Sequence, residues 1–220
     1  MAAAAAAVRA RIAAAGGDPG TVRVVAVTKG FGPDVARATV AAGLLDVGEN
    51  YAQELLAKAV GWDTVPAPRW HFLGAVQRNK VPALAPVVDC WQSVARAVEG
   101  EAIARRRPGA GVLVEVDLTG RKGRNGCSPD AVPALVTDLG SLGLDVRGLM
   151  TVAPPGPGGA RPAFRTVRDL ADRLGLPERS MGMSGDLEDA VAEGSTMVRV
   201  GRALFGARGV RPRGGRRTTL

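Results

Sequence analysis

The chain has 220 residues, 46% of them hydrophobic, and a mean hydropathy of +0.06. This length supports one sizeable core, and no apolar run approaches the roughly 20 residues that a membrane-spanning helix needs. The net charge of +8 comes from eight arginines, five between 208 and 217 and three at 105–107. No basic stripe is interleaved with aromatic residues, so the sequence does not predict specific nucleic-acid binding.

Two cysteines and one His, without ligand spacing, argue against a disulfide framework and against a metal site. Residues 1–7 lack the bulky apolar stretch of a secretory signal, so we expect a cytoplasmic protein without membrane association. Residues 1–208 are predicted to form a single domain. The Gly/Arg-rich tail at 209–220 is predicted to be disordered.

In chain order, an Ala-rich helix at 2–15 is followed by short apolar runs that alternate with helix-patterned stretches. The predicted strands are 22–27, 44–47, 69–73, 87–90, 112–117, 145–149, 179–181 and 196–200. The predicted helices between them are 34–42, 50–59, 77–84, 92–106, 129–141, 163–174, 187–193 and 202–206. Eight strand–helix repeats predict parallel pairing, and strands that are apolar on both faces favour a closed (β/α)8 TIM barrel. An open doubly wound sheet is the alternative.

Lys29 lies where the first predicted strand ends, before a Gly-Phe-Gly-Pro turn. Only four of the 29 basic residues are Lys, and a Lys amine, unlike a guanidinium, can form a Schiff base with an aldehyde. In a barrel, chemistry belongs at the carboxyl ends of the strands, which is where Lys29 would lie. A Lys that merely extends from a strand end to solvent is the alternative.

Two glycine-bearing segments follow the seventh and eighth predicted strands. Ser184-Gly185 precedes one predicted helix, and Gly201-Arg202 precedes the next. Free backbone N–H groups at a helix start suit a phosphate, and adjacent sites of this kind are common in such barrels. Each segment alone is better explained as a helix cap or a tight turn. Together with Lys29 they indicate a phosphorylated aldehyde, for which pyridoxal 5′-phosphate (PLP) is the obvious candidate.

Several segments spread over residues 20 to 208 closely resemble the pyridoxal phosphate homeostasis protein family, also called the YggS/PROSC family. They are VAVTK (25–29), VGENYAQE (47–54), WHFLG (70–74) with Gln77 and Asn79-Lys80, GCSP (126–129), RGLM (147–150), and the stretches 180–186 and 193–201. The resemblance implies a single barrel of the alanine racemase N-terminal type without a second β domain. It also implies bound PLP, a vitamin B6 cofactor, a monomer, and a role in PLP homeostasis without an established reaction. PLP-dependent apoenzymes are the candidate recipients.

The resemblance also assigns roles by position. Lys29 resembles the Schiff-base lysine, Asn50 a side chain near the cofactor ring, and Arg199 the arginine that faces the ring nitrogen. Ser184 resembles the phosphate-binding hydroxyl, with Gly201 as a backbone donor beside it. The remaining cofactor-binding candidates are Met150, Gly185 and Arg202.

The sequence departs from the family pattern at Arg202, where many members carry Thr or Ser, so one hydroxyl contact to the phosphate would be lost. Ala75 and Thr28 also differ from residues frequent in the family. His71 is interpreted as a hydrogen-bonded core or rim residue and not as a base. Cys127 is interpreted as a small packed residue, because no second His is available to activate it.

Two other functions stay open from the sequence. A PLP-dependent amino-acid racemase needs a second base, and the one Tyr of the chain is Tyr51. An aldolase that uses Lys29 on a sugar phosphate would purify without the visible absorption of a bound cofactor.

Overall fold

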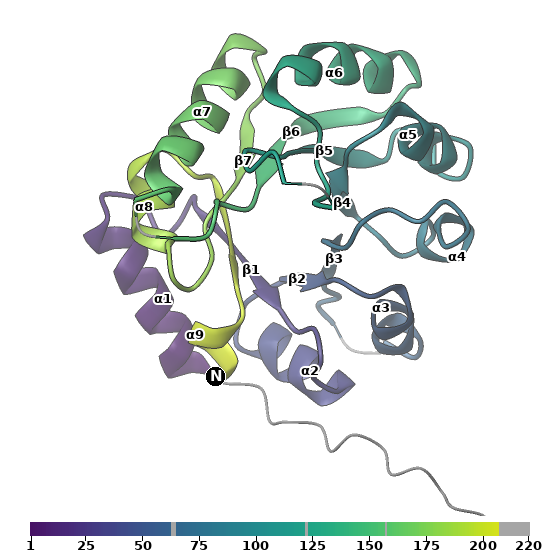
Figure 1. Ribbon diagram of the computed structural model, residues 1–220. Coiled ribbons are helices and arrows are strands. Elements are labelled where there is room, and N and C mark those ends of the chain that lie inside the picture. Colours follow the sequence, from purple (N-terminus) through teal and green to yellow (C-terminus); the bar gives the residue numbers. More distant parts are fainter. Residues whose placement is uncertain (63–64, 122, 157, 207–220) are drawn as a thin grey trace, which may run out of the picture.

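The computed structural model describes residues 1–62, 65–121, 123–156 and 158–206, and it forms a closed barrel of eight parallel strands in chain order (Figure 1). The strands are β1 (Arg23–Val27), β2 (Asp46–Glu49), β3 (Arg69–Phe72), β4 (Cys90–Val94), β5 (Gly111–Val116), β6 (Asp145–Thr151), β7 (Glu178–Ser180) and β8 (Met197–Val200). β1 pairs with both β2 and β8, which closes the sheet. The predicted barrel is confirmed, and the open sheet is wrong.

Helices surround the barrel and cover the outward faces of its strands (Figure 1). They are α1 (Ala2–Ala14), α2 (Pro33–Ala41), α3 (Ala52–Ala59), α4 (Val81–Leu84), α5 (Ala97–Ala104), the 3-10 turn η1 (Pro129–Ala131), α6 (Val132–Ser141), α7 (Ala160–Arg173), α8 (Leu187–Ala192) and α9 (Arg202–Phe205). The main core lies between this ring and the sheet, as the completely buried Leu55, Ile103 and Phe164 illustrate. None of the helices within the described ranges is long and apolar enough to cross a membrane.

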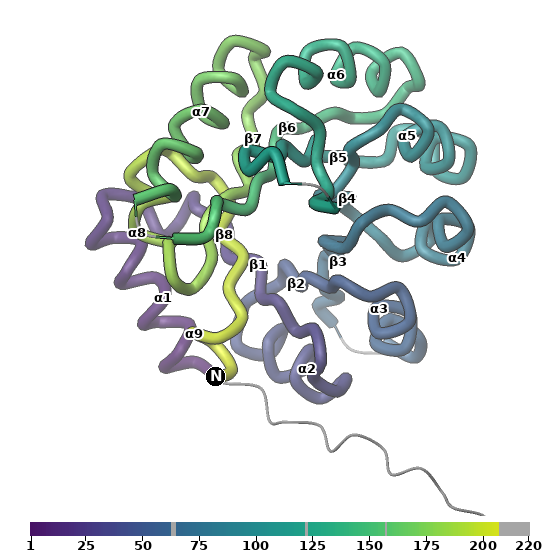
Figure 2. Tube along the Cα trace, viewed as in Figure 1, coloured from purple at the N-terminus to yellow at the C-terminus, as the bar shows by residue number. Residues whose placement is uncertain are grey.

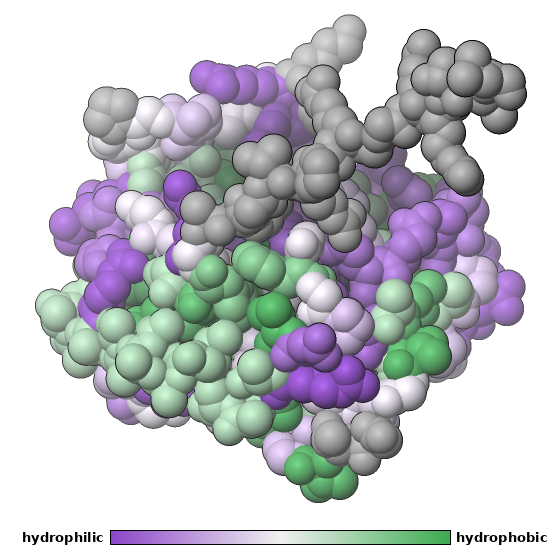
Figure 3. Space-filling view, turned by 90° about the horizontal axis from the view of Figure 1, so that it is seen from below, coloured by the Kyte–Doolittle hydropathy of each residue, from purple (hydrophilic) through white to green (hydrophobic). Residues whose placement is uncertain are grey.

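The additional helix α1 packs beside α8 and α9. Ala5, Val8 and Ile12 turn one of its faces inward, while most of its other alanines are exposed. The pale green side chains gathered on one face in Figure 3 lie over this helix. Arg11 anchors it, because its Nε donates to the Glu188 carboxylate over 2.6 Å and its Nη2 donates to the Ser184 carbonyl over 3.0 Å.

The largest boundary error concerns β4. The sequence predicted a strand at 87–90 and a helix from 92, but β4 continues to Val94 and α5 begins only at Ala97. Gln92 and Ser93 are completely buried inside the barrel, where Ser93 donates a hydrogen bond to the Gly74 carbonyl. These polar residues broke the apolar pattern of the strand, and their partners lie outside it, Gly74 after β3 and Ser180 on β7.

Smaller differences also matter for the site. β2 lies two residues later than predicted and therefore ends on Glu49, while β6 extends to Thr151 and includes Met150, which the sequence placed after the strand. α4 begins at Val81 and not at 77, and α7 begins at Ala160 and not at 163. The predicted disordered tail at 209–220 lies outside the described residues.

Candidate functional site

A pocket of about 740 Å³ opens at the carboxyl ends of the strands. Its walls come from strand ends and from the loops after β1, β5, β6, β7 and β8. Figure 2 shows how the loop before α7 and the loop before α8 approach the segment between β8 and α9. These segments are far apart in the sequence, and closure of the barrel brings them together.

All eight predicted cofactor-binding residues line this single pocket. They are Lys29, Asn50, Met150, Ser184, Gly185, Arg199, Gly201 and Arg202. Met150 does so from within β6, because side chains near the end of a strand that point into the barrel reach the pocket floor. The structure thus brings the predicted residues together, while their roles toward a cofactor stay predictions.

Lys29 lies half-buried directly after β1, and its two chain neighbours are held by hydrogen bonds. Thr28 donates from Oγ1 to the Glu49 carboxylate over 2.5 Å, and its carbonyl accepts from Nζ of Lys58 over 2.8 Å. The Gly30 N–H donates to Oε2 of Glu54 over 2.7 Å. The backbone on both sides of Lys29 is therefore fixed by residues from β2 and α3.

Glu49 and Lys58 form a buried ion pair below this turn, with exposed fractions of 0% and 3%. Burial raises the pKa of Glu49, although hydrogen bonds from Lys58 and Thr28 oppose that shift. Oε2 of Glu49 is buried without a hydrogen-bond partner among the described residues. Burying two charges costs desolvation free energy, so we interpret the pair as one that positions the backbone beside Lys29 rather than one that adds stability.

Asn50 follows Glu49 and reaches the pocket beside a close backbone crossing. A Cβ atom at Gly74 would lie 2.0 Å from the Asn50 carbonyl oxygen, far inside contact distance. Any residue larger than Gly at 74 would therefore push the Asn50 backbone. The Gly74 of the WHFLG motif is explained by this crossing.

Arg199 lies at the floor of the pocket, and only 5% of it is exposed. Its Nη1 donates to the carbonyl and to the hydroxyl of Ser180, each over 2.7 Å, and its Nη2 donates to the Thr151 carbonyl over 2.7 Å. Burial lowers the pKa of Arg199 to about 10, which still leaves it a cation at neutral pH. The pocket floor therefore presents a fixed positive group.

Four lining residues were predicted to bind a phosphate, and we name them the phosphate end of the pocket. They are Ser184, Gly185, Gly201 and Arg202, between β7 and α9. Oγ of Ser184 accepts a hydrogen bond from the Ala203 N–H over 3.2 Å, which ties the two loops together. At Gly185, a Cβ atom would meet only the Arg202 guanidinium, at 4.0 Å. The backbone at Gly185 is thus open, and Arg202 itself is exposed.

Comparison with known proteins agrees with this geometry. The family model described as alanine racemase, N-terminal domain, matches residues 4–209. Two relatives bear the name pyridoxal phosphate homeostasis protein. That of Pseudomonas aeruginosa is 40% identical over 93% of this chain and 92% of its own length, and that of Deinococcus radiodurans is 42% identical over 88% and 93%.

The chain belongs to the pyridoxal phosphate homeostasis protein family. Among solved structures, PipY of Synechococcus elongatus with PLP bound has a TM-score of 0.79 and is 33% identical, over 90% of this chain and all of that one. The recognition of the family from sequence motifs is therefore confirmed.

The sequence did not point to three charged residues that line the pocket, Glu115, Arg124 and Asp189. Glu115 comes from β5, and its Oε2 accepts from Nδ2 of Asn125 over 2.5 Å. Burial raises the pKa of Glu115, although the hydrogen bond from Asn125 and the charges of Arg199 and Arg124 oppose this. Residues 152–156 and 158 also contribute to the lining. A signal existed only for Glu115, as a charged residue near the end of an apolar strand.

Three residues that the sequence left in doubt do not line the pocket in the described part of the chain. His71 is 2% exposed and hydrogen-bonded, as interpreted from the sequence. Cys127 is half-buried, its N–H donates to the Glu115 carbonyl, and burial raises the pKa of its thiol to about 11. Tyr51 is 56% exposed.

Proposed function

We propose that the chain binds PLP through Lys29 and acts in PLP homeostasis, by storing, buffering or delivering the cofactor to PLP-dependent apoenzymes. The observation that carries the proposal is the convergence of an amine, a phosphate end and a buried guanidinium on one pocket. Names of relatives at 40% and 42% identity support it, as does the PLP-bound PipY structure.

The residues present fit each part of PLP. We propose that the Lys29 amine holds the aldehyde as a Schiff base and that Asn50 lies beside the ring. The phosphate would bind at the Ser184 hydroxyl and at the open backbone of Gly185 and Gly201, with Arg202 adding charge at the exposed edge. The pocket volume of about 740 Å³ leaves room for the whole cofactor.

Arg199 is the residue that favours a carrier over an enzyme of the transaminase kind. PLP stabilises carbanions best when its ring nitrogen is protonated, and a fixed cation beside that nitrogen disfavours the protonation. Arg199 is held as a hydrogen-bond donor by Ser180 and Thr151. We therefore propose that this site suits a carrier better than a broad transaminase.

The racemase alternative requires a second base across the pocket from Lys29. Tyr51, the one Tyr of the chain, is exposed and does not belong to the described lining. This placement supports the homeostasis role.

The test is the visible absorption spectrum of purified protein incubated with PLP, followed by borohydride reduction and mass-spectrometric mapping of the modified residue. We expect a visible band, stable attachment to Lys29 after reduction, and loss of both in Lys29→Ala. Lys80→Ala is the matched control, since Lys80 precedes α4 and does not line the pocket as described.

Attachment at Lys58, Lys80 or Lys122 would contradict the site assignment. A protein that takes up no PLP would contradict the proposal as a whole and would favour the aldolase. Turnover of an amino acid that depends on Lys29 would favour the racemase.

A further inference from the structure

We propose that three side chains inside the barrel, His71, Gln92 and Ser180, form a hydrogen-bonded chain that fixes Arg199 at the pocket floor. The chain ends on the Asp46 carboxylate, toward the amino end of the barrel. Its consequence for cofactor affinity rests on the proposed function, whereas the chain itself does not. None of the three belongs to the described lining of the pocket, so they are positioning residues for Arg199.

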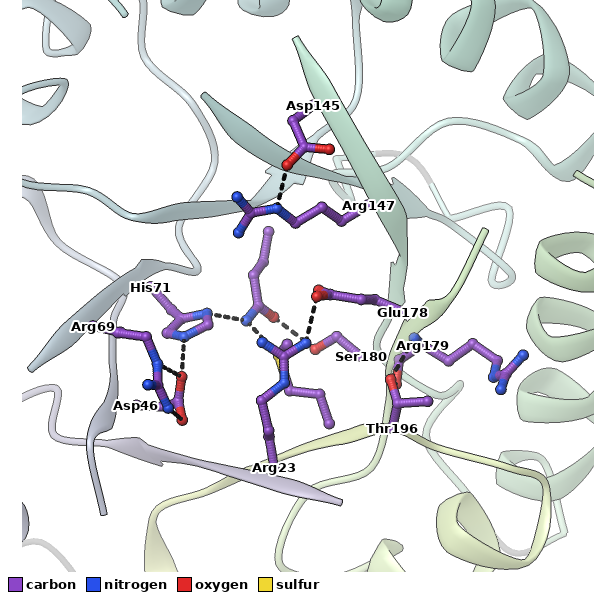
Figure 4. A network of polar contacts seen from close by, with 12 residues as sticks. Arg23, Asp46, Arg69, His71, Asp145, Arg147, Glu178, Arg179, Ser180 and Thr196 are labelled. Carbon is purple, nitrogen blue, oxygen red and sulfur yellow. Dashed lines mark hydrogen bonds and ion pairs between the residues drawn. The ribbon is translucent and has the colours of Figure 1, made fainter. Parts of the chain in front are cut away.

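The links are short and continuous. Nη1 of Arg199 donates to Oγ of Ser180 over 2.7 Å, and that hydroxyl donates to Oε1 of Gln92 over 2.6 Å. Nε2 of Gln92 lies 2.7 Å from Nδ1 of His71, and Nε2 of His71 lies 2.9 Å from Oδ1 of Asp46. Figure 4 shows His71 directed toward Asp46 on one side of the barrel interior and Ser180 on the other.

Every member of the chain is buried, with exposed fractions between 0% and 5%. A buried polar side chain costs stability unless it is hydrogen-bonded, so each member depends on its neighbours. Gln92 from β4 is the central link, because it reaches His71 on β3 with its amide nitrogen and Ser180 on β7 with its oxygen. The link from Gln92 to Ser180 thus crosses the interior between β4 and β7, which do not pair, while the other links join neighbouring strands.

The hydrogen-bond directions follow from Asp46. Burial alone would raise the pKa of this carboxyl, but hydrogen bonds from Arg69 and His71 outweigh burial and hold the pKa well below its usual range. An ionised carboxylate can only accept, so the hydrogen of His71 lies on Nε2 and Nδ1 accepts from Gln92. The Gln92 oxygen then accepts the Ser180 hydrogen.

This order leaves the lone pairs of Ser180 Oγ facing Arg199, so the last position requires a donor. A protonated guanidinium supplies it, and reversal of one link would place two hydrogens or two lone pairs against each other. The hydrogen-bonded chain therefore fixes the place of Arg199 and requires its N–H as the last donor. A second fixed contact, from Nη2 to the Thr151 carbonyl, prevents rotation of the guanidinium.

The hydrogen-bonded chain can be tested without cofactor, because His71 is the only His of the protein. In protein labelled with ¹⁵N-histidine, NMR reports on this one imidazole. We expect the hydrogen on Nε2 toward Asp46 and an Nδ1 that accepts from Gln92, and a shift of the Nδ1 signal in Ser180→Ala. A doubly protonated ring, a hydrogen on Nδ1, or an unchanged signal in Ser180→Ala would overturn the chain.

The consequence is tested by PLP titration of the same variants. Ser180→Ala and Gln92→Leu are expected to weaken PLP binding about tenfold, the size of one lost hydrogen bond to a charged group. Addition of PLP should shift the His71 signals in the wild type, and this shift should be absent in Gln92→Leu. Ser180→Ala removes a single atom, so it provides the test if Gln92→Leu does not fold.

Ser195→Ala is the matched control. Ser195 is also buried, with 4% exposed, and its hydroxyl donates to the carbonyls of Met181 and Met197 without contact to Arg199. Unchanged PLP affinity in this control supports the positioning role. An equal loss of affinity in Ser195→Ala, or no loss in Ser180→Ala, would overturn it. A wild-type protein that binds no PLP but shows the expected His71 tautomer would contradict the proposed function and keep the chain.

Discussion

The Lys29 side and the Arg199 side of the pocket are supported in different ways. Lys29 lies between residues held by Glu49, Glu54 and Lys58, all of which follow it within 30 positions of the chain. Arg199 depends on side chains from strands as distant in sequence as β2 and β8. The first support is built by β1, β2 and α3, whereas the second exists only after the whole barrel has closed. One pocket therefore combines a local turn with a network that spans the fold.

The largest effect is expected from the buried ion pair on the Lys29 side. Lys58→Met leaves the Glu49 carboxylate buried without its cation, which is expected to lower the free energy of unfolding by ~3–5 kcal/mol. Urea denaturation measures this loss in the free energy of unfolding. The double variant Lys58→Met/Glu49→Gln removes the orphaned charge and should recover part of the loss. Equal losses of unfolding free energy in the single and double variants would show that the ion pair does not support the Lys29 side of the pocket.

Substitution of two glycines tests the two sides of the pocket directly. A Cβ atom would lie 2.0 Å from the Asn50 carbonyl at Gly74 and 1.9 Å from the Glu178 carbonyl at Gly148. Gly74→Ala and Gly148→Ala should each cost about 1–3 kcal/mol of stability, because backbone must move. Only Gly74→Ala should also weaken PLP binding in a titration, since Asn50 lines the pocket and Glu178 lies at the start of β7.

Gly140→Ala is the control for both substitutions. Gly140 lies in α6, and an added Cβ atom would meet no heavy atom within 4 Å, so the change should stabilise the helix by about 0.5–1 kcal/mol. A loss of PLP affinity in Gly148→Ala as large as that in Gly74→Ala would contradict the distinction between the two sides.

The two sides should respond to pH in opposite directions. The pKa of Asp46 in the folded protein lies below its ordinary value of 3.8, so its contribution to stability is present above pH 3.8 and is lost as pH falls further. The pKa of Glu49 is raised above 4.5, so its contribution is present below pH 4.5 and is lost as pH rises through the folded value.

Urea denaturation at a series of pH values measures both contributions as slopes. Asp46→Asn should flatten the fall in stability on the acid side of pH 3.8. Glu49→Gln should instead make stability rise more, or fall less, above pH 4.5. Slopes that change in the same direction in the two variants would contradict the assignment of these carboxyl groups.

The same contrast explains what could be predicted from the sequence. Alternating strands and helices predicted the barrel, and strand-end position together with family motifs predicted Lys29, Asn50 and Ser184 as neighbours in space. These signals are local. The hydrogen-bonded chain through Gln92 was missed, because the partners of Gln92, His71 and Ser180, are 21 and 88 positions away in the sequence. A polar residue with such distant partners looks like the end of a strand.

The pocket residues that the sequence missed have the same explanation. Glu115 interacts with the charges of Arg199 and Arg124 because closure of the barrel places β5, its following loop and β8 around the same pocket. The Gly/Pro-rich loop at 152–158 has no periodic pattern, so nothing in the sequence placed it over the pocket. Strand-end position and family motifs therefore predicted the groups that line the pocket better than the groups that hold them in place.

The smallest effect is expected at the phosphate end, which belongs to neither side. Arg202 replaces the Thr or Ser frequent in the family, yet it is exposed, and an exposed charge contributes at most about 1 kcal/mol, or roughly fivefold in affinity. Arg202→Thr should therefore change PLP affinity by less than about fivefold in a spectroscopic titration, because the new hydroxyl offsets the lost charge. The salt dependence of PLP affinity is a clearer readout of the Arg202 charge. The wild-type affinity should fall with added salt, and that of the variant should fall less.

Ser184→Ala is the comparison for this last substitution, since it removes the hydroxyl that also accepts from the Ala203 N–H. We expect it to weaken binding more than Arg202→Thr does, by about tenfold. A larger loss in Arg202→Thr would mean that the guanidinium has taken over the phosphate from Ser184, and that the exposed edge of the pocket, not its two buried sides, sets the affinity.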